Sequence, residues 1–458
     1  MKQGLLNGTR RSILGMGTAA FGTGILAACG QQAAPSTGTT TTASQPTALA
    51  KKNVTVRITA RQNPEQDMWP IRVPQFQEKY PNIKVEPDLH AGNIQEKTAA
   101  LIASNTVGDV VHTHFSAAQP QNLYLGKSMI ALDALIAKDK LDLKGWYPQA
   151  IDAGKVDGKV IALPFKGKMA TVALFYNLTM FEQAGIKPPD LNTTLEQLLE
   201  MAVKLTRPDG SQWGIAGTLP DNARSLTGTL RRWNANVYDG EQKKATLDTP
   251  EARTGFGWFY DAFHRRKVAD PVANQPVLFR EGKAAMLIHE DFNQKTSIHP
   301  AAESQGWKYG ATLIPKGPTG KRGGVWIPDA LQVSAQSANQ AEAWEALKWF
   351  SNKETGLALG QQKSQGTSTT PGARPDVYND PGFLNHPVFP KLLQELDRDS
   401  NVLGENYQGS IPHNYKITEV NAVLKKAVEQ IRKNEAEPTP AFLKNLNDEV
   451  QNVLSLPR

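Results

Sequence analysis

The chain has 458 residues, of which 40% are apolar and 21% charged, and it contains a single Cys. This composition excludes collagen-like, coiled-coil and wholly disordered chains, and one thiol excludes both an intramolecular disulfide and a zinc site built from cysteines. Lys plus Arg number 51 against 44 for Asp plus Glu, so the formal charge of +7 is mild and does not indicate a nucleic-acid groove. At about 150 residues per domain, the length predicts two or three domains.

Residues 1–28 are typical of an export signal. Two basic residues, Arg10 and Arg11, precede an apolar, Gly-spaced stretch at 13–28 that ends in small residues. The stretch is too short and too rich in Gly for a comfortable membrane span, and a true anchor helix is the alternative. The arginine pair resembles a twin-arginine signal, but Gly15 stands where Lys is usual, so the sequence leaves the export route open.

The segment after the signal is expected to be a lipid-anchored tether. Leu26-Ala27-Ala28-Cys29 resembles a bacterial lipobox, and this resemblance implies that Cys29 is lipidated and becomes the first residue after cleavage. Residues 31–50 carry no charge and almost no bulky apolar side chain, so they cannot bury enough surface to order themselves. The sequence therefore predicts a disordered tether over 29–51 and a folded body from Lys52 onward.

The first part of the body predicts alternating strands and helices. Apolar alternation and β-branched residues predict strands at 54–59, 83–86 and 109–115, and helical apolar spacing predicts helices at 68–80 and 94–104. This β-α-β-α-β order is typical of a parallel sheet with helices on its faces, hence of an α/β fold.

The remaining pattern is mixed, without an internal repeat or a membrane-spanning length. The expected elements are a hairpin at 155–164, strands at 172–177, 284–288, 307–314 and 324–333, and helices at 194–206, 223–234, 250–266, 338–352 and 387–400, with two more after Tyr415. A capped start at Thr194 and a Pro- and Gly-rich loop at 315–323 mark two of the boundaries.

Short motifs occur along the body in a characteristic order. They are FQEKYPNIKV at 76–85, GDVV at 108–111, GKVIALPF at 158–165, LFYN at 174–177, FEQAGI at 181–186, FREGKAAM at 279–286, IPKGP at 314–318, GG at 323–324 and TP at 370–371. Behind a lipobox, this set resembles the bacterial extracellular solute-binding proteins of the sugar-binding, maltose-binding-like type. The resemblance covers nearly the whole body.

The resemblance implies a two-lobed α/β clamp of the periplasmic-binding-protein type II fold. We expect one lobe from 52–163 with 323–352, a second from 164–314 with 366–458, and about three crossings between them, near Pro164 and within 315–322 and 353–365. The ligand would lie in the cleft between the lobes, which close on it like a hinge.

The same resemblance implies a function in import. It predicts a lipid-anchored binding protein outside the cytoplasmic membrane that captures a sugar or oligosaccharide and delivers it to the permease of an ABC transporter. We expect a monomer without catalysis, cofactor, bound metal or nucleic-acid partner.

Two arguments predict the ligand-binding residues. Ligands bind at the carboxyl ends of parallel strands, which nominates Arg61 and Gln62 after the first strand and His114 and Phe115 after the third. Sugars need aromatic faces for their C–H patches and polar groups for their hydroxyls. Aromatic and polar residues in predicted loops or near crossings complete the set: Phe165, Lys166, Trp233, Asn234, Asp291, Phe292, Trp326 and Arg374.

Other functions stay open at this level. His112 and His114, on one strand, would point to the same side as half of a metal site, although no third ligand is evident. A secreted hydrolase is a further alternative, but Gly-x-Ser-x-Gly, His-Glu-x-x-His and phosphate-loop motifs are missing from the sequence. A binding protein for a polyamine, phosphate ester or metal, and a purely structural surface lipoprotein, are the remaining alternatives.

Overall fold

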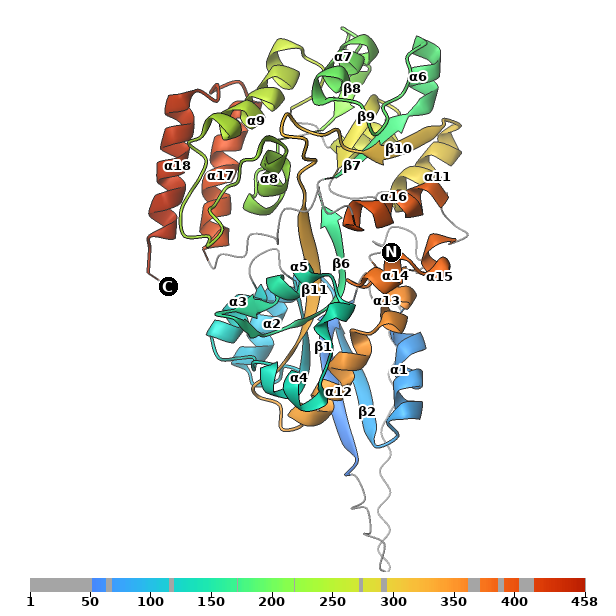
Figure 1. Cartoon of the computed structure of the whole chain (residues 1–458), viewed down its shortest axis with the longest axis vertical. Coiled ribbons are helices and arrows are strands. Elements are labelled where there is room, and N and C mark those ends of the chain that lie inside the picture. Colours follow the sequence, from blue (N-terminus) through green and yellow to red (C-terminus); the bar gives the residue numbers. More distant parts are fainter. Residues whose placement is uncertain are drawn as a thin grey trace, which may run out of the picture. The chain divides into compact units, whose positions relative to one another are not determined.

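The computed structural model describes residues 52–62, 68–114, 119–170, 172–217, 219–271, 275–289, 295–360, 371–385, 391–402 and 416–457. The predicted signal, Cys29 and the predicted tether lie outside these residues. Within the described part, the structure is a mixed α/β body with two main sheets and one short hairpin (Figure 1).

The first sheet has five strands in the order β2-β1-β3-β11-β6. Their bounds are β1 (Val54–Arg61), β2 (Ile83–His90), β3 (Val110–His114), β6 (Leu163–Ala170) and β11 (Val325–Val333). Strand β1 runs parallel to β2 and β3, whereas β11 lies antiparallel to both β3 and β6. Helices α1 (Trp69–Lys79) and α2 (Ile94–Ala103) connect the parallel strands, which confirms the predicted β-α-β-α-β order.

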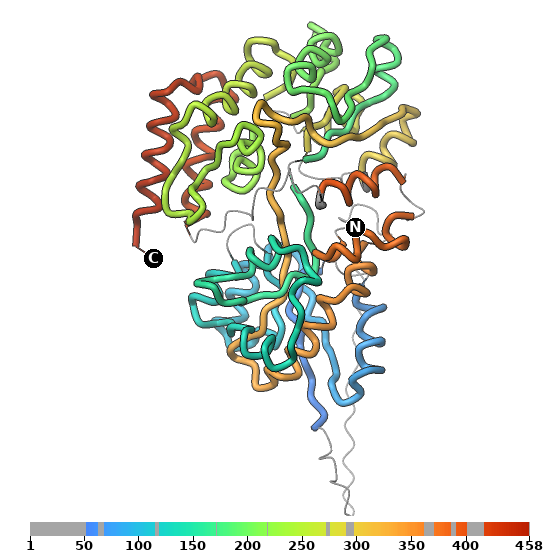
Figure 2. Tube along the Cα trace, in the orientation of Figure 1, coloured from blue at the N-terminus to red at the C-terminus, as the bar shows by residue number. Residues whose placement is uncertain are grey.

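Strand β11 enters this sheet from far along the sequence. It lies between β3 and β6, and the colours of Figure 2 show this late segment inserted among early ones. All nine of its residues are buried, as expected of a central strand covered on both faces. Helix α12 (Gln340–Phe350) packs against β11, β1 and β3 and buries Trp344 and Phe350.

The second sheet has four strands in the order β10-β7-β9-β8. Their bounds are β7 (Ala173–Asn177), β8 (Trp213–Ala216), β9 (Ala284–His289) and β10 (Tyr309–Leu313). Strand β7 is antiparallel to both neighbours, and β8 is parallel to β9. Helix α7 (Leu195–Leu205) packs on β8 and starts with the expected capping box, in which Thr194 and Gln197 exchange hydrogen bonds.

Helices and short elements complete the body. The early ones are α3 (Gln119–Leu125), α4 (Asp133–Asp139), η3 (Leu143–Gly145), α5 (Pro148–Ala153), β4 (Lys155–Val156), β5 (Lys159–Val160) and α6 (Leu178–Ala184). The middle ones are α8 (Ala223–Leu230), η4 (Arg231–Trp233), α9 (Pro250–Tyr260), the π-helical turn η5 (Asp261–Arg265), α10 (Gln275–Arg280) and α11 (Lys295–Gln305). The late ones are α13 (Lys353–Gly360), α14 (Pro375–Tyr378), α15 (Pro381–Leu384), α16 (Lys391–Val402), α17 (Ile417–Arg432) and α18 (Pro440–Leu454).

The connections between the sheets differ in detail from the expected boundaries. Pro164 lies inside β6 of the first sheet, and the chain reaches the second sheet only between Ala170 and Ala173. The segment 314–324 joins β10 of the second sheet to β11 of the first. Helix α13 contacts β6 and α1, so it packs with the first sheet, although 353–365 was expected to cross. The division into lobes stays a prediction at these boundaries.

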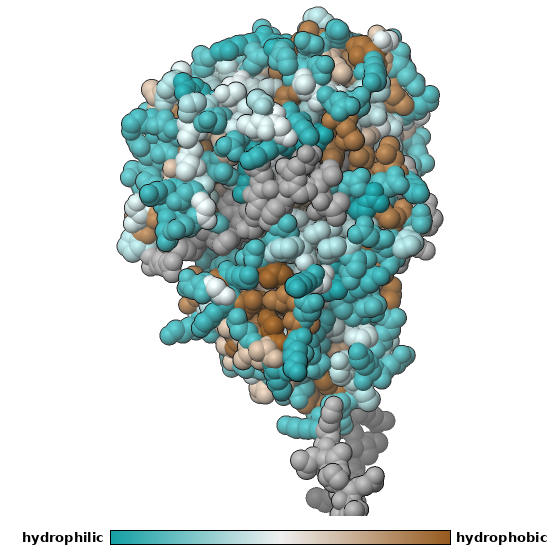
Figure 3. All heavy atoms as spheres, in the orientation of Figure 1, coloured by the Kyte–Doolittle hydropathy of each residue, from teal (hydrophilic) through white to brown (hydrophobic). Residues whose placement is uncertain are grey.

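One face of the body is mostly polar. Figure 3 shows one face on which hydrophilic residues predominate and apolar ones form separate groups. A few large apolar side chains are exposed, namely Ile71, Leu125, Leu191, Val203, Leu392 and Leu456. No helix within the described ranges combines the length and the hydropathy needed to span a membrane.

Candidate solute-binding site

A buried carboxylate organises the carboxyl ends of the parallel strands in the first sheet. Asp329 lies in β11, directly opposite His114 of β3 on one side and Lys166 of β6 on the other. Directly opposed residues on neighbouring antiparallel strands point to the same face, so the register itself brings these three side chains together. The pairing shifts by one residue between Asp329 and Ala330, which is a β-bulge.

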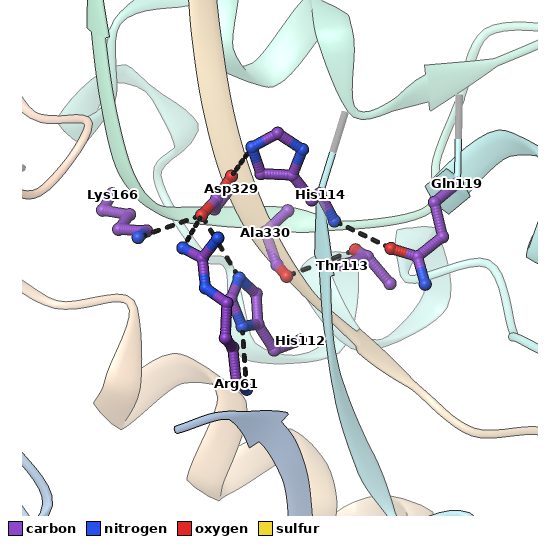
Figure 4. A network of polar contacts seen from close by, with 8 residues as sticks. All are labelled: Arg61, His112, Thr113, His114, Gln119, Lys166, Asp329 and Ala330. Carbon is purple, nitrogen blue, oxygen red and sulfur yellow. Dashed lines mark hydrogen bonds and ion pairs between the residues drawn. The ribbon is translucent and has the colours of Figure 1, made fainter. Parts of the chain in front are cut away.

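Four basic side chains converge on Asp329 (Figure 4). Its Oδ2 atom lies 3.0 Å from Lys166 Nζ, 3.3 Å from His112 Nε2 and 3.4 Å from Arg61 Nη2. Its Oδ1 atom lies 3.3 Å from His114 Nε2. Donors from β1, β3 and β6 therefore share one acceptor on β11. We call these five residues the Asp329 cluster.

The electrostatics of the cluster favour an ionised Asp329. Burial alone raises the pKa of this carboxyl, but the neighbouring charges of His114 and Lys166 and the hydrogen bond from His112 outweigh burial and hold the pKa well below its usual value. Burial lowers the pKa of His114 to about 4, with Asp329 opposing the shift and nearby Arg224 and Arg61 adding to it. At neutral pH the His114 ring is therefore uncharged.

The side chain of His112 is more buried than that of His114. Its side chain is 1% exposed, against 23% for His114. Its ring meets Phe165 edge-on, with 5.0 Å between the ring centroids. The backbone N–H of Arg61 donates to His112 Nδ1 at 3.5 Å, so in the neutral ring the proton lies on Nε2, toward Asp329. As expected, the two histidines of β3 point to the same side.

Backbone contacts hold the end of β3 in place. Thr113 Oγ1 donates to the carbonyl of Ala330 at 3.2 Å, and Gln119 Oε1 accepts from the backbone N–H of His114 at 3.0 Å (Figure 4). Gln119 is the first residue of α3. The backbone that carries His114 is thus held from β11 and from the following helix.

Four of the residues nominated from sequence lie together in this region: Arg61, His114, Phe165 and Lys166. Gln62 is exposed beside Arg61, and its backbone N–H donates to His90 O at 2.8 Å. Phe115, Asp291 and Phe292 lie outside the described residues. Ligand contact by any of these residues stays a prediction.

The two nominated tryptophans are core residues in this structure. Trp326 is 0% exposed and its ring centroid lies 4.8 Å from that of Tyr147. Trp233 is 4% exposed and lies 6.2 Å from Trp258 between ring centroids. Because both rings are covered by the protein itself, this conformation offers neither of them to a ligand. Apolar packing explains their positions.

The two remaining nominated residues have local partners. Asn234 has a left-handed backbone with φ of 64° at the end of η4, and its Oδ1 accepts from Lys321 Nζ at 3.1 Å. Arg374 donates to both oxygens of Asp376 at 3.0 and 2.8 Å, and its guanidinium lies 4.6 Å from the ring centroid of Trp146. These contacts account for both side chains without a ligand.

Sequence reasoning missed Asp329, the centre of the cluster. A signal was present, since Asp329 is the one charged residue in the strand VWIPDALQV and Asp is depleted in strands. A buried charge must be paired, so an acid inside an apolar strand indicates basic neighbours. In the described part of the chain, no group of three or more His, Cys, Asp or Glu side chains could hold a metal ion.

The chain is similar to known solute-binding proteins in both sequence and fold. The chain is 28% identical over 327 residues to the maltotriose-binding protein of Pyrococcus abyssi (strain GE5 / Orsay), an alignment that covers 66% of each protein. An ABC substrate-binding protein from Listeria monocytogenes, solved in complex with cycloalternan, matches with a TM-score of 0.71 at 18% identity and covers 89% of this chain and 100% of its own.

A third similar structure is UgpB from Mycobacterium tuberculosis in complex with glycerophosphocholine. It matches with a TM-score of 0.70 at 17% identity, over 88% of this chain and 98% of its own. These likenesses show the two-lobed α/β fold of periplasmic solute-binding proteins, which confirms the fold expected from sequence. A family model described as "Bacterial extracellular solute-binding protein" matches residues 63–356. The chain therefore belongs to the bacterial extracellular solute-binding proteins.

Proposed function

We propose that this protein is the solute-binding lipoprotein of an ABC importer and that it captures a sugar or oligosaccharide outside the cytoplasmic membrane. Family membership and the relative that binds maltotriose support this proposal. The observation that carries it is the Asp329 cluster. Polar side chains gather there at the carboxyl ends of β1 and β3, where open α/β sheets bind ligands.

The chemistry of the cluster suits hydroxyl-rich solutes. The Arg61 and His114 side chains are 28% and 23% exposed, so each keeps part of its surface outside the cluster. Guanidinium N–H groups can donate to sugar hydroxyl oxygens, an imidazole nitrogen that bears no proton can accept from a hydroxyl, and Phe165 supplies an apolar neighbour. In this proposal the protein binds and releases its solute without chemical change.

The export signal and the anchor belong to the same proposal. Residues 1–28 would direct export, and Cys29 would carry the lipid that keeps the protein at the outer face of the membrane next to its permease. Expression of the full chain and of Cys29→Ser tests this part. The lipidated chain should fractionate with membranes and gain the mass of a diacylglyceryl group, whereas the variant should lose both properties.

A phosphate ester is the second candidate solute. Arg61 and Lys166 bring two basic donors into the cluster, and guanidinium and ammonium groups recognise phosphate as well as hydroxyls. The similar fold of a protein solved with glycerophosphocholine adds to this interest. The two candidates differ in whether binding weakens with salt, because only the charged solute depends strongly on screened attraction.

Thermal unfolding of the body from residue 51 tests the proposal against maltotriose, cycloalternan, glycerophosphocholine and spermidine. A solute at 100 times its dissociation constant stabilises the folded state by about 2.7 kcal/mol, which gives a clear upward shift. A higher unfolding temperature with either saccharide supports the proposal. A higher unfolding temperature with glycerophosphocholine alone would favour a phosphate ester as the solute instead. If none of the four solutes shifts the transition, sugar capture is not supported.

A matched pair of variants on β1 locates the site. Arg61→Gln removes a guanidinium from the Asp329 cluster, whereas Arg57→Gln removes one from the same strand that pairs with Asp88 at 3.8 Å. If the cluster binds the solute, Arg61→Gln lowers the affinity for the solute that stabilised the wild-type protein, and Arg57→Gln leaves that affinity unchanged. Equal affinities in both variants would place the site elsewhere.

A further inference from the structure

Asp329 differs from two of its partners, Arg61 and His114, in how much surface its side chain keeps exposed. Its side chain is 6% exposed, whereas Arg61 and His114 keep 28% and 23%. An ionised carboxylate offers about four lone-pair positions. Three partners, from Arg61, His112 and Lys166, share Oδ2, and His114 lies at Oδ1. Both oxygens of Asp329 are thus engaged by groups of its own chain, and little of the carboxylate surface is left exposed.

We propose that Asp329 is a positioning residue of the binding site, which acts through Arg61 and His114 and does not itself contact the solute. This inference rests on the proposed function, because it assigns a role within that site. The carboxylate orients two side chains that reach the surface. It keeps the guanidinium of Arg61 and the imidazole of His114 at defined places before a solute arrives.

The energetic argument is one of preorganisation. Arg and Lys side chains carry much rotamer entropy, and a site that orders them only on binding loses affinity to that ordering. Ion pairs to a fixed carboxylate order them beforehand. Asp329 is itself held by two neighbouring strands and is buried, so it is a rigid reference point for Arg61 at the end of β1.

Two variants and one control separate positioning from general stability. Asp329→Asn keeps the shape but removes the charge, and Asp329→Glu keeps the charge on a chain one methylene longer. Asp139→Asn is the control, because Asp139 of α4 bonds Lys348 and Trp344 of α12, away from the Asp329 cluster. Far-UV circular dichroism establishes which variants are folded before they are compared.

The first readout follows the histidine rings by NMR between pH 3 and pH 8. Asp329 favours the protonated form of His114, so Asp329→Asn lowers the pKa of this ring below its wild-type value of about 4 and shifts the signals of both His112 and His114. Asp139→Asn leaves these signals unchanged. If Asp329→Asn also leaves them unchanged, the carboxylate does not position the rings and the inference is wrong.

The second readout is a double-mutant cycle with maltotriose as the probe, measured by calorimetry. Loss of a hydrogen bond to a charged group costs about tenfold or more in affinity, so Arg61→Gln and Asp329→Asn should each weaken maltotriose binding by that factor. If Asp329 acts through Arg61, the affinity of the double variant for maltotriose is no lower than the lower of the two single-variant affinities. Asp329→Glu recovers part of the affinity.

The outcomes of the cycle are distinct. Additive losses would mean that Asp329 acts independently of Arg61, as a direct contact does, and would overturn the inference. Wild-type affinity in Asp329→Asn would overturn it as well. If the wild-type protein does not bind maltotriose, the proposed use of this probe fails, and the histidine signals still decide whether Asp329 positions its partners.

Discussion

Two regions of this molecule bury basic side chains by different means. In the Asp329 cluster, a carboxylate accepts from Arg61, Lys166 and two histidines. Near the segment that joins β10 to β11, Arg232 donates to the carbonyl of Arg322 at 3.2 Å, and Arg322 donates to the carbonyls of Ile314 and Leu191. We call Arg232 and Arg322 the arginine pair.

The kind of acceptor, carbonyl or carboxylate, indicates what each region is suited to do. Main-chain carbonyls are partial charges fixed in the backbone, so the arginine pair, at 2% and 4% exposure, fastens a connecting segment to η4. Burial lowers the pKa of Arg232 to about 9, which still leaves it charged at neutral pH. The Asp329 cluster instead concentrates full charges, and two of its side chains, Arg61 and His114, are partly exposed. Such an arrangement responds to pH, and we propose that it also binds the solute.

The largest expected effect comes from removing the shared carboxylate. Asp329→Ala leaves Lys166 and Arg61 without their buried counter-charge, and breaking a buried ion pair on one side costs about 3–5 kcal/mol. We expect a loss of this size in the free energy of unfolding, measured by urea titration at pH 7. The double variant with Lys166→Met should recover part of the loss. A loss below about 1 kcal/mol would show that the cluster is not electrostatically coupled.

A smaller loss is expected at the arginine pair. Arg322→Met leaves the buried carbonyl of Ile314 and the carbonyl of Leu191 without this donor, and an unsatisfied buried polar group costs about 1–3 kcal/mol. The neighbouring Lys321→Met is the control, because Lys321 bonds Asn234 at the surface, and it should change stability by no more than about 0.5 kcal/mol. Equal effects of the two substitutions in urea titration would remove the distinction between the two regions.

The third effect is absent at neutral pH and appears only in acid conditions. The pKa of His114 is about 4 in the folded protein against 6.5 for an ordinary histidine, so the unfolded chain binds more protons between these values. Stability is therefore fully present above about pH 6.5 and declines as the pH falls toward 4. His114→Gln should make the free energy of unfolding less dependent on pH in that window. An unchanged slope would mean that His114 is not the titrating group.

The order of elements was largely predictable from sequence. The strands at 54–59 and 83–86 show period-2 alternation, and the helix at 194–206 has both apolar spacing and a capping box, so local patterns sufficed. The site was predicted only in part. The carboxyl ends of β1 and β3 led to Arg61 and His114 by a general rule on parallel sheets. Trp233 and Trp326 were nominated for their chemistry, and burial, which depends on the whole fold, placed them in the core.

The sequence by itself determined the α/β class, the solute-binding resemblance and the strand ends that carry polar residues, because those features depend on short-range periodicity and local motifs. Only the tertiary structure decided that Asp329 stands opposite both His114 and Lys166. The residues of that pairing are separated by 215 and 163 positions (329 − 114 and 329 − 166), and they meet because β11 inserts between β3 and β6. Strand register is a property of the assembled sheet, and it is register that places one carboxylate within reach of four donors.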